Sequence, residues 1–136
     1  MKICEYPAIA ENLRPVLTLI AEEMTSCGTQ TRLRQKLFII IEELFNNSAM
    51  HAYAGLPTPG PVRVTFSCDT DSASLLVEDR GVPFNPLKDV DEGRRIRNLE
   101  TFTEGGEGIH LVRALASSIE YTHENGWNKV SVLVDA

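Results

Sequence analysis

The most informative segment of this chain, residues 42–53, reads Glu42-Glu43-Leu44-Phe45-Asn46-Asn47-Ser48-Ala49-Met50-His51-Ala52-Tyr53. Glu43, Asn47 and His51 follow one another at intervals of four residues, so in a helix they lie on one face. The polar residues could simply form a solvated helix face, but asparagine is a poor helix former, and two in succession within a helix need a reason. Asn47 offers the neutral oxygen that Mg²⁺ accepts as a ligand, and Glu43 can take a proton from an attacking hydroxyl. Glu42 and Asn46 repeat the same spacing in a second register.

Residues 42–53 form the end of a helix that begins near residue 30. Thr29 or Thr31 could cap its start, and the helical pattern runs to about Tyr53. An earlier helical pattern extends to Met24 and is stopped at Gly28. Pro15 lies inside this pattern, so that helix either begins near residue 12 or is kinked.

The remaining segments alternate between strand and helix patterns. We expect strands over residues 2–6, 62–68 and 74–79, a helix over residues 108–118, and a closing hairpin that turns at residues 125–126. Two helices, a hairpin, a loop, a helix and a second hairpin predict an α+β two-layer sandwich, with helices on one face of a mixed, largely antiparallel sheet.

Two further stretches depart from what packing alone selects. At the end of a strand, Asp79 can accept a hydrogen bond from an exocyclic amine, and Gly81 lets a flat ring approach the backbone. Gly105, Gly106 and Gly108 lie directly before a helix, where free amides and the helix dipole favour an anion. The glycines form neither a P-loop nor a dinucleotide fingerprint.

Composition narrows the class of protein. The 136 residues suffice for one domain, and a net charge of −6 with a pI near 5.0 disfavours general nucleic-acid binding and anionic membranes. Phosphate is not excluded, because backbone amides and a metal ion can hold it. Cys4, Cys27 and Cys68 are odd in number and form no CxxC, so we expect reduced thiols. Without a signal peptide or a membrane-spanning apolar run, a cytoplasmic location is expected.

The order and spacing of these motifs resemble the GHKL ATP-binding (Bergerat, or histidine-kinase-like ATPase) fold, and most of all the small anti-sigma factor serine kinases. The likeness covers nearly the whole chain, so we expect one domain over residues 1–136. It favours Glu43 with Asn47 as the register, because only that register places His51 in the pattern. The matching residues are Glu43, Asn47, Ser48, His51, Ala52, Tyr53, Asp79, Gly81, Pro83, Phe84, Pro86, Gly105, Gly106, Gly108, Ile109, Leu111, Val112 and Arg113.

This resemblance implies a role for each site residue. Asn47 would bind the Mg²⁺ that bridges the ATP phosphates, and Glu43 would be the general base. Asp79 would read the adenine amino group above Gly81, and residues 85–104 would form an ATP lid, one of whose arginines could reach a phosphate. The other residues implied in ATP binding are His51, Gly105, Gly106, Gly108 and Ile109.

The implied activity is that of an ATP-dependent protein serine/threonine kinase acting as an anti-sigma factor in a partner-switching system. It would bind a sigma factor in one state and phosphorylate a serine of an anti-sigma-antagonist protein in another. The resemblance also suggests a homodimer. The alternative is an ATP-dependent regulatory binding module with little or no kinase activity, whose lid reports ATP occupancy to a partner.

Overall fold

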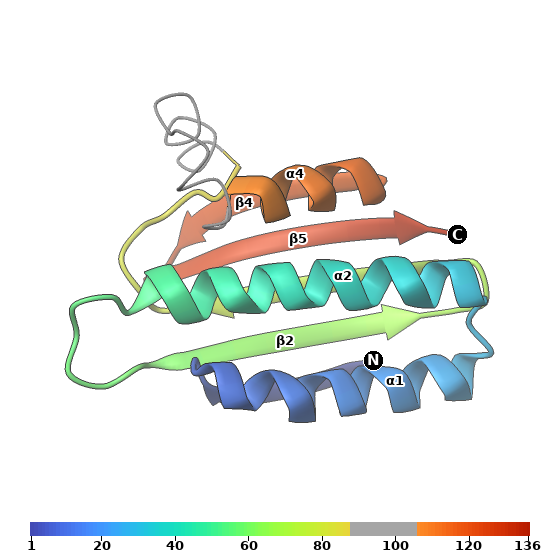
Figure 1. The fold of residues 1–136 in the computed structure, drawn as a ribbon, viewed down its shortest axis with the longest axis horizontal. Helices are drawn as coiled ribbons and strands as arrows, with labels where there is room; N and C mark the ends of the chain where they lie inside the picture. Colours follow the sequence, from blue (N-terminus) through green and yellow to red (C-terminus); the bar gives the residue numbers. More distant parts are fainter. Residues whose placement is uncertain (88–105) are drawn as a thin grey trace.

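The computed structural model describes residues 1–87 and 106–136, in which five strands form one sheet (Figure 1). The strands lie in the order β1-β2-β3-β5-β4, and all four pairings between them are antiparallel. The expected two-layer α+β fold is confirmed, but this described sheet is antiparallel throughout rather than mixed. The elements are β1 Lys2–Pro7, the 3₁₀ turn η1 Ala10–Asn12, α1 Leu13–Cys27, α2 Thr31–Asn47, the π-helix η2 Ser48–Ala52, β2 Pro61–Cys68, β3 Ser72–Asp79, α4 Gly106–Leu115, β4 Ser118–Glu124 and β5 Trp127–Asp135.

One face of the sheet is covered by the helices, with α1 and α2 side by side in Figure 1 and α4 next to α2. The strands alternate, so that Val62, Val64 and Phe66 of β2 are buried while the residues between them are not. Ile109 and Val112 of α4 are fully buried against the same core. None of the helices in the described ranges is long and apolar enough to cross a membrane.

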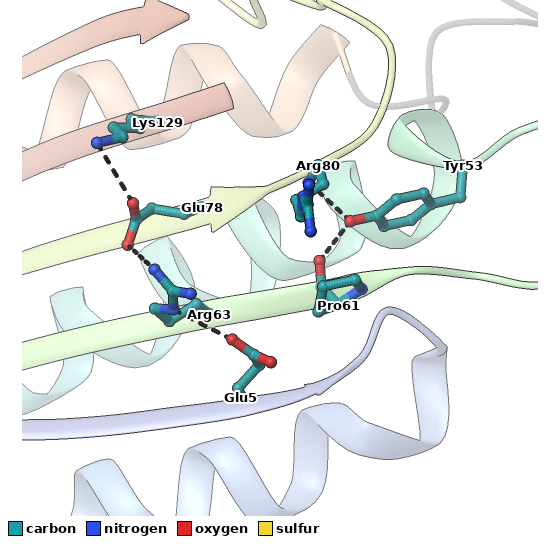
Figure 2. Close-up of polar contacts among 7 residues, drawn as sticks. All are labelled: Glu5, Tyr53, Pro61, Arg63, Glu78, Arg80 and Lys129. Carbon is teal, nitrogen blue, oxygen red and sulfur yellow. Dashed lines mark hydrogen bonds and ion pairs between the residues drawn. The ribbon is translucent and has the colours of Figure 1, made fainter. Parts of the chain in front are cut away.

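The open face of the sheet carries a row of alternating charges (Figure 2). Glu5, Arg63, Glu78 and Lys129 are successive neighbours across β1, β2, β3 and β5. Arg63 reaches both acids, with Nε 3.1 Å from Glu5 Oε1 and Nη1 3.8 Å from Glu78 Oε1, and Lys129 Nζ lies 3.7 Å from Glu78 Oε2. Glu78 is buried, so the two flanking cations are what make its charge tolerable.

The helix ends differ in part from the sequence-based expectation. The capping prediction was wrong: α2 begins at Thr31 after Gln30, with no side-chain cap. The hydroxyl of Thr29 donates instead to the Asp69 carbonyl at 3.0 Å, because this helix start packs on the β2–β3 turn. Pro15 falls in the first turn of α1, where a missing N–H costs nothing.

The third helix ends earlier than predicted. It stops at Leu115 rather than continuing to residue 118, because Ser118 opens β4. The connection is held by backbone bonds from the Ala116 N–H to Val112 and from the Ser117 N–H to Leu133. The chain therefore leaves the helix and joins the sheet a few residues earlier than the apolar pattern predicts.

The end of the second helix is wider than an α-helix and approaches the chain after β3 closely. Residues Ser48–Ala52 form η2, a π-helical turn of the kind often found at functional sites. The carbonyl of Ala52 accepts a hydrogen bond from the Val82 N–H at 3.1 Å. A Cβ at Gly81 would lie 2.0 Å from that same carbonyl oxygen. Gly81 is therefore required by backbone packing, a role that the sequence did not indicate.

We predict that Gly81→Ala lowers the free energy of unfolding by about 2–3 kcal/mol, because the new methyl group meets rigid backbone and not a side chain that can move. Urea denaturation measures the change. Val82→Ala is the matched control, since Val82 is 57% exposed and should change stability by at most about 0.5 kcal/mol. Equal stability of Gly81→Ala and the wild type would contradict the close approach.

Candidate functional site

A small cavity lies where the end of α2, the end of β3 and the start of β5 meet. Its volume is about 20 Å³, enough for roughly one water molecule. The residues that line it are Leu44, Asn47, Ser48, Ala52, Val77, Asp79, Phe84, Pro86, Asn128 and Val130. Two of the sequence-predicted site residues, Asn47 and Asp79, thus share one cavity although 32 positions separate them in the sequence.

The carboxylate of Asp79 is buried and accepts three hydrogen bonds. Ser48 Oγ donates to Oδ2 at 2.8 Å, while Asn128 Nδ2 and the Gly81 N–H donate to Oδ1 at 2.8 and 3.1 Å. The donors come from η2, from β5 and from the chain after β3, so one carboxylate ties these segments together. A buried carboxylate requires such donors, because burial without them costs several kcal/mol.

Asn128 is a site residue to which the sequence analysis assigned no role. Its side chain is 4% exposed, and besides Asp79 its Nδ2 donates to the Val82 carbonyl at 2.9 Å. Its Oδ1 accepts hydrogen bonds from the Phe84 N–H at 3.2 Å and from the Tyr121 hydroxyl at 2.5 Å. The sequence pattern of β5 could have identified Asn128, because this residue occupies the same buried face as the alternating valines at positions 130, 132 and 134. A polar residue on an apolar face indicates a hydrogen-bonded role.

Asn47 is buried in the same cavity, and its Nδ2 has no hydrogen-bond partner among the residues that the structure describes. A buried polar atom without a partner costs about 1–3 kcal/mol. Rotating the amide by half a turn would present Oδ1 at the same position. Asn46 is more exposed, and Glu42, its companion in the alternative register, is exposed.

Glu43, one helical turn before Asn47, lies against the first turn of α4. A Cβ at Gly108 would be 1.9 Å from Glu43 Oε2, so only glycine fits there with the carboxylate in this position. The fold thus brings together two motifs that are 65 residues apart in the sequence. The start of a helix is also its electrically positive end, which favours a nearby anion.

Four further residues were expected from the sequence to bind ATP, namely His51, Gly105, Gly106 and Ile109. The His51 ring stacks on Phe84 with centroids 4.9 Å apart and an interplanar angle of 22°. Ile109 is completely buried in the core, so its side chain holds α4 in place and only its backbone remains for a ligand. Gly106 is the first residue of α4, whereas Gly105 and the predicted lid beyond Leu87 lie outside the described residues.

Tyr53 fixes the backbone beside the site (Figure 2). Its hydroxyl accepts a hydrogen bond from the Arg80 N–H at 2.7 Å and donates to the Pro61 carbonyl. Burial raises the pKa of the Tyr53 hydroxyl, so it stays a donor at neutral pH. The side chain joins the end of η2 to the start of β2 and the end of β3.

The side chains around Asn47 can be compared with the ligands that Mg²⁺ requires. The described residues contain no group of three or more His, Cys, Asp or Glu side chains able to hold a metal ion. Mg²⁺ needs none, since it commonly binds through one or two protein oxygens together with substrate phosphates and water. The carboxamide of Asn47 offers a hard oxygen donor of that kind and therefore fits the ion.

Solved structures define the class of this fold. The chain superposes on the RsbU and RsbW domains of Rv1364c from Mycobacterium tuberculosis with a TM-score of 0.63, at 17% identity over 99% of this chain and 32% of that one. It also superposes on the catalytic domain of the histidine kinase ThkA with a TM-score of 0.53, at 16% identity over 99% of this chain and 97% of that one. The chain therefore has the histidine kinase ATPase fold.

Sequence comparison then gives the family. Residues 6–133 match the histidine kinase-like ATPase domain, and the chain belongs to that family. It is 28% identical to the serine/threonine-protein kinase BtrW of Bordetella bronchiseptica over 74% of this chain and 70% of that protein. It is 27% identical to the serine-protein kinase RsbW of Bacillus mycoides over 90% of this chain and 77% of that protein.

We predict that Asn128→Ala lowers the free energy of unfolding by about 3 kcal/mol, because it leaves the buried Asp79 carboxylate short of a donor and removes the partners of Phe84 and Tyr121. Thermal and urea denaturation measure the loss. His123→Ala is the control, since His123 is the exposed cross-strand neighbour of Asn128. A loss of stability no larger than that of the control would show that the hydrogen bonds of Asn128 do not stabilise the site.

Proposed function

We propose that this chain binds ATP with Mg²⁺ at the candidate site and acts as a protein serine/threonine kinase. The observation that carries the proposal is the buried Nδ2 of Asn47, which has no hydrogen-bond partner among the described residues and lies in the cavity that also holds Asp79. The kinase names of the relatives BtrW and RsbW support the same proposal. The wider role proposed is that of an anti-sigma factor in the cytoplasm, which phosphorylates an anti-sigma-antagonist protein and binds a sigma factor.

Asp79 would recognise the adenine amino group. Its Oδ2 accepts one bond, from Ser48, and an oxygen of this type can accept a second. The cavity of about 20 Å³ is far smaller than an adenine ring. Phe84 and Pro86, which line it, would therefore have to move outward when the base enters, and the His51–Phe84 stack would have to rearrange.

The phosphates would lie between Asn47 and the start of α4. The amides of Gly105, Gly106 and Gly108 would donate to them, and Asn47 would contribute its oxygen to the metal ion. Mg²⁺, when bound, supplies positive charge that offsets the charge of the phosphates. This arrangement explains how a chain of net charge −6 could hold a polyanion without a basic patch.

Glu43 would be the general base. Its carboxylate lies one helical turn from Asn47 and next to Gly108, close to where the phosphates would bind. It would accept the proton of the attacking serine hydroxyl as that oxygen bonds to phosphorus. The second candidate is a regulatory module without transfer. The packing of Glu43 on Gly108 favours it, because that contact gives the carboxylate a structural role of its own.

We predict that Asn47→Ala abolishes Mg²⁺-dependent ATP binding, because the metal ion loses its protein ligand. Without nucleotide, the variant should be no less stable than the wild type, since the substitution removes an Nδ2 group that is buried without a partner among the described residues. Calorimetric titration with ATP and Mg²⁺ measures the first effect and thermal denaturation the second. Asn46→Ala is the register control and should change affinity by at most about twofold. Normal ATP binding by Asn47→Ala would refute this assignment of the site.

We predict that Glu43→Gln retains ATP binding and lowers phosphoryl transfer by roughly 10²–10⁴-fold, because the amide keeps the size of the side chain but cannot accept the proton. Transfer of labelled phosphate from ATP to candidate antagonist proteins measures the effect. Glu42→Gln is the matched control and should leave the rate unchanged. ATP binding without transfer by the wild type would favour the regulatory module instead.

A further inference from the structure

Two cysteines meet at the edge of the molecule opposite the candidate site. Cys27 is the last residue of α1 and Cys68 the last residue of β2, and both elements end at the right-hand edge of Figure 1. Their sulfur atoms are 2.8 Å apart, with the Cys68 thiol donating to Cys27 Sγ. The Cys27 thiol donates to the Cys68 carbonyl at 3.0 Å. Both are free, half-buried thiols.

Hydrogen bonds outside the two side chains hold this arrangement. Gly28 ends α1 in the left-handed conformation, with φ of 66°, which turns the chain towards the β2–β3 turn. The Thr29 hydroxyl then donates to the Asp69 carbonyl, and the Gln30 N–H donates to the Thr70 carbonyl, each at 3.0 Å. The residues that follow each cysteine are thereby joined, so a covalent link between the sulfurs needs little movement of the backbone.

We propose that Cys27 and Cys68 form a site of reversible oxidation, at which a peroxide converts the two thiols into a disulfide within the chain. The pair is accessible to a small peroxide, because Cys27 is only half-buried and the adjacent Cys68 lines an open hollow of about 390 Å³ together with Asp69, Ser72 and Ser117. Cys4, the third cysteine, is on β1 and is not part of this pair.

The reaction balances with one peroxide for each disulfide. Burial raises the pKa of the Cys68 thiol to about 11, and its hydrogen bond to Cys27 contributes to the increase, so Cys68 keeps its proton at neutral pH. The Cys68 thiol donates to Cys27 Sγ and would stabilise a thiolate there, so Cys27 attacks first: its sulfur loses a proton and bonds to a peroxide oxygen, the O–O bond breaks and one water leaves. Cys68 then gives up its proton and attacks the Cys27 sulfur, the S–O bond breaks and a second water leaves. The sulfurs lose two electrons and the peroxide gains them.

The link would stabilise the fold without disturbing the candidate site. Cys68 pairs with Ala73 across the sheet and Val62 with Asp79, so six residues of strand, about 20 Å, separate the two places. The disulfide would join residues 41 positions apart and restrict the unfolded chain accordingly. We therefore expect oxidation to raise the melting temperature by roughly 5–15 °C.

The test treats the reduced full-length chain with hydrogen peroxide and counts free thiols by alkylation and mass spectrometry. The count should fall from three per chain to one, and a thiol reductant should restore it. Combined digestion with trypsin and Glu-C separates Cys4 from Cys27 by cleaving at Glu5 and Glu11, and the linked peptides should contain Cys27 and Cys68. No step uses ATP, so the outcome is independent of the proposed function.

Two variants complete the test. Cys4→Ser keeps the pair and should show the same disulfide and the same rise in melting temperature. Cys27→Ser lacks the pair and should show neither. The proposal would be overturned if the wild type kept three thiols, if its disulfide contained Cys4 or joined two chains, or if oxidation also stabilised Cys27→Ser. The peptide map of the wild type is decisive even if a serine variant folds poorly.

Discussion

The buried carboxylate of Asp79 is the constraint on which the rest of the site depends. The alternation of β3 places Asp79 on the same face as Val77 and Leu75, so its charge enters the core layer beneath the helices. Such a charge is tolerated only with donors of fixed geometry. Ser48 and Asn128 supply them, and this requirement sets the positions of η2 and β5 relative to the end of β3.

The close contact between Gly81 and Ala52 follows from the same requirement. For Ser48 to reach Asp79, η2 must lie against the chain that leaves β3, and the Ala52 carbonyl then occupies the space that a side chain at position 81 would need. The Tyr53 hydroxyl holds the next turn in place through Arg80 and Pro61. Several residues of the family motif therefore serve the frame of the site before they serve any chemistry.

Much of this could be predicted from the sequence, and the exceptions have physical reasons. Period-2 and period-3.6 patterns identified the strands and helices, because burial of one face controls both. The cap at Thr29 was wrong because its hydroxyl bonds to Asp69, a partner 40 residues away that no local rule can anticipate. Asn128 was given no role and the packing role of Gly81 was missed, since each depends on a contact between distant segments. The residues of the predicted lid lie outside the described chain, so their assignment stays a prediction.

Asp79 and Asn47 lie in one cavity and differ in a way that bears on ligand binding. Both oxygens of Asp79 accept hydrogen bonds from protein donors, so its position is set before any ligand arrives. Nδ2 of Asn47 is buried without a hydrogen-bond partner within the described chain. A folded protein retains such a deficit where the surrounding packing enforces it and a bound group can repay it. A ligand that pairs with the Asn47 amide would relieve this cost, which makes Asn47 a better indicator of a ligand than Asp79, whose two oxygens both already accept protein hydrogen bonds.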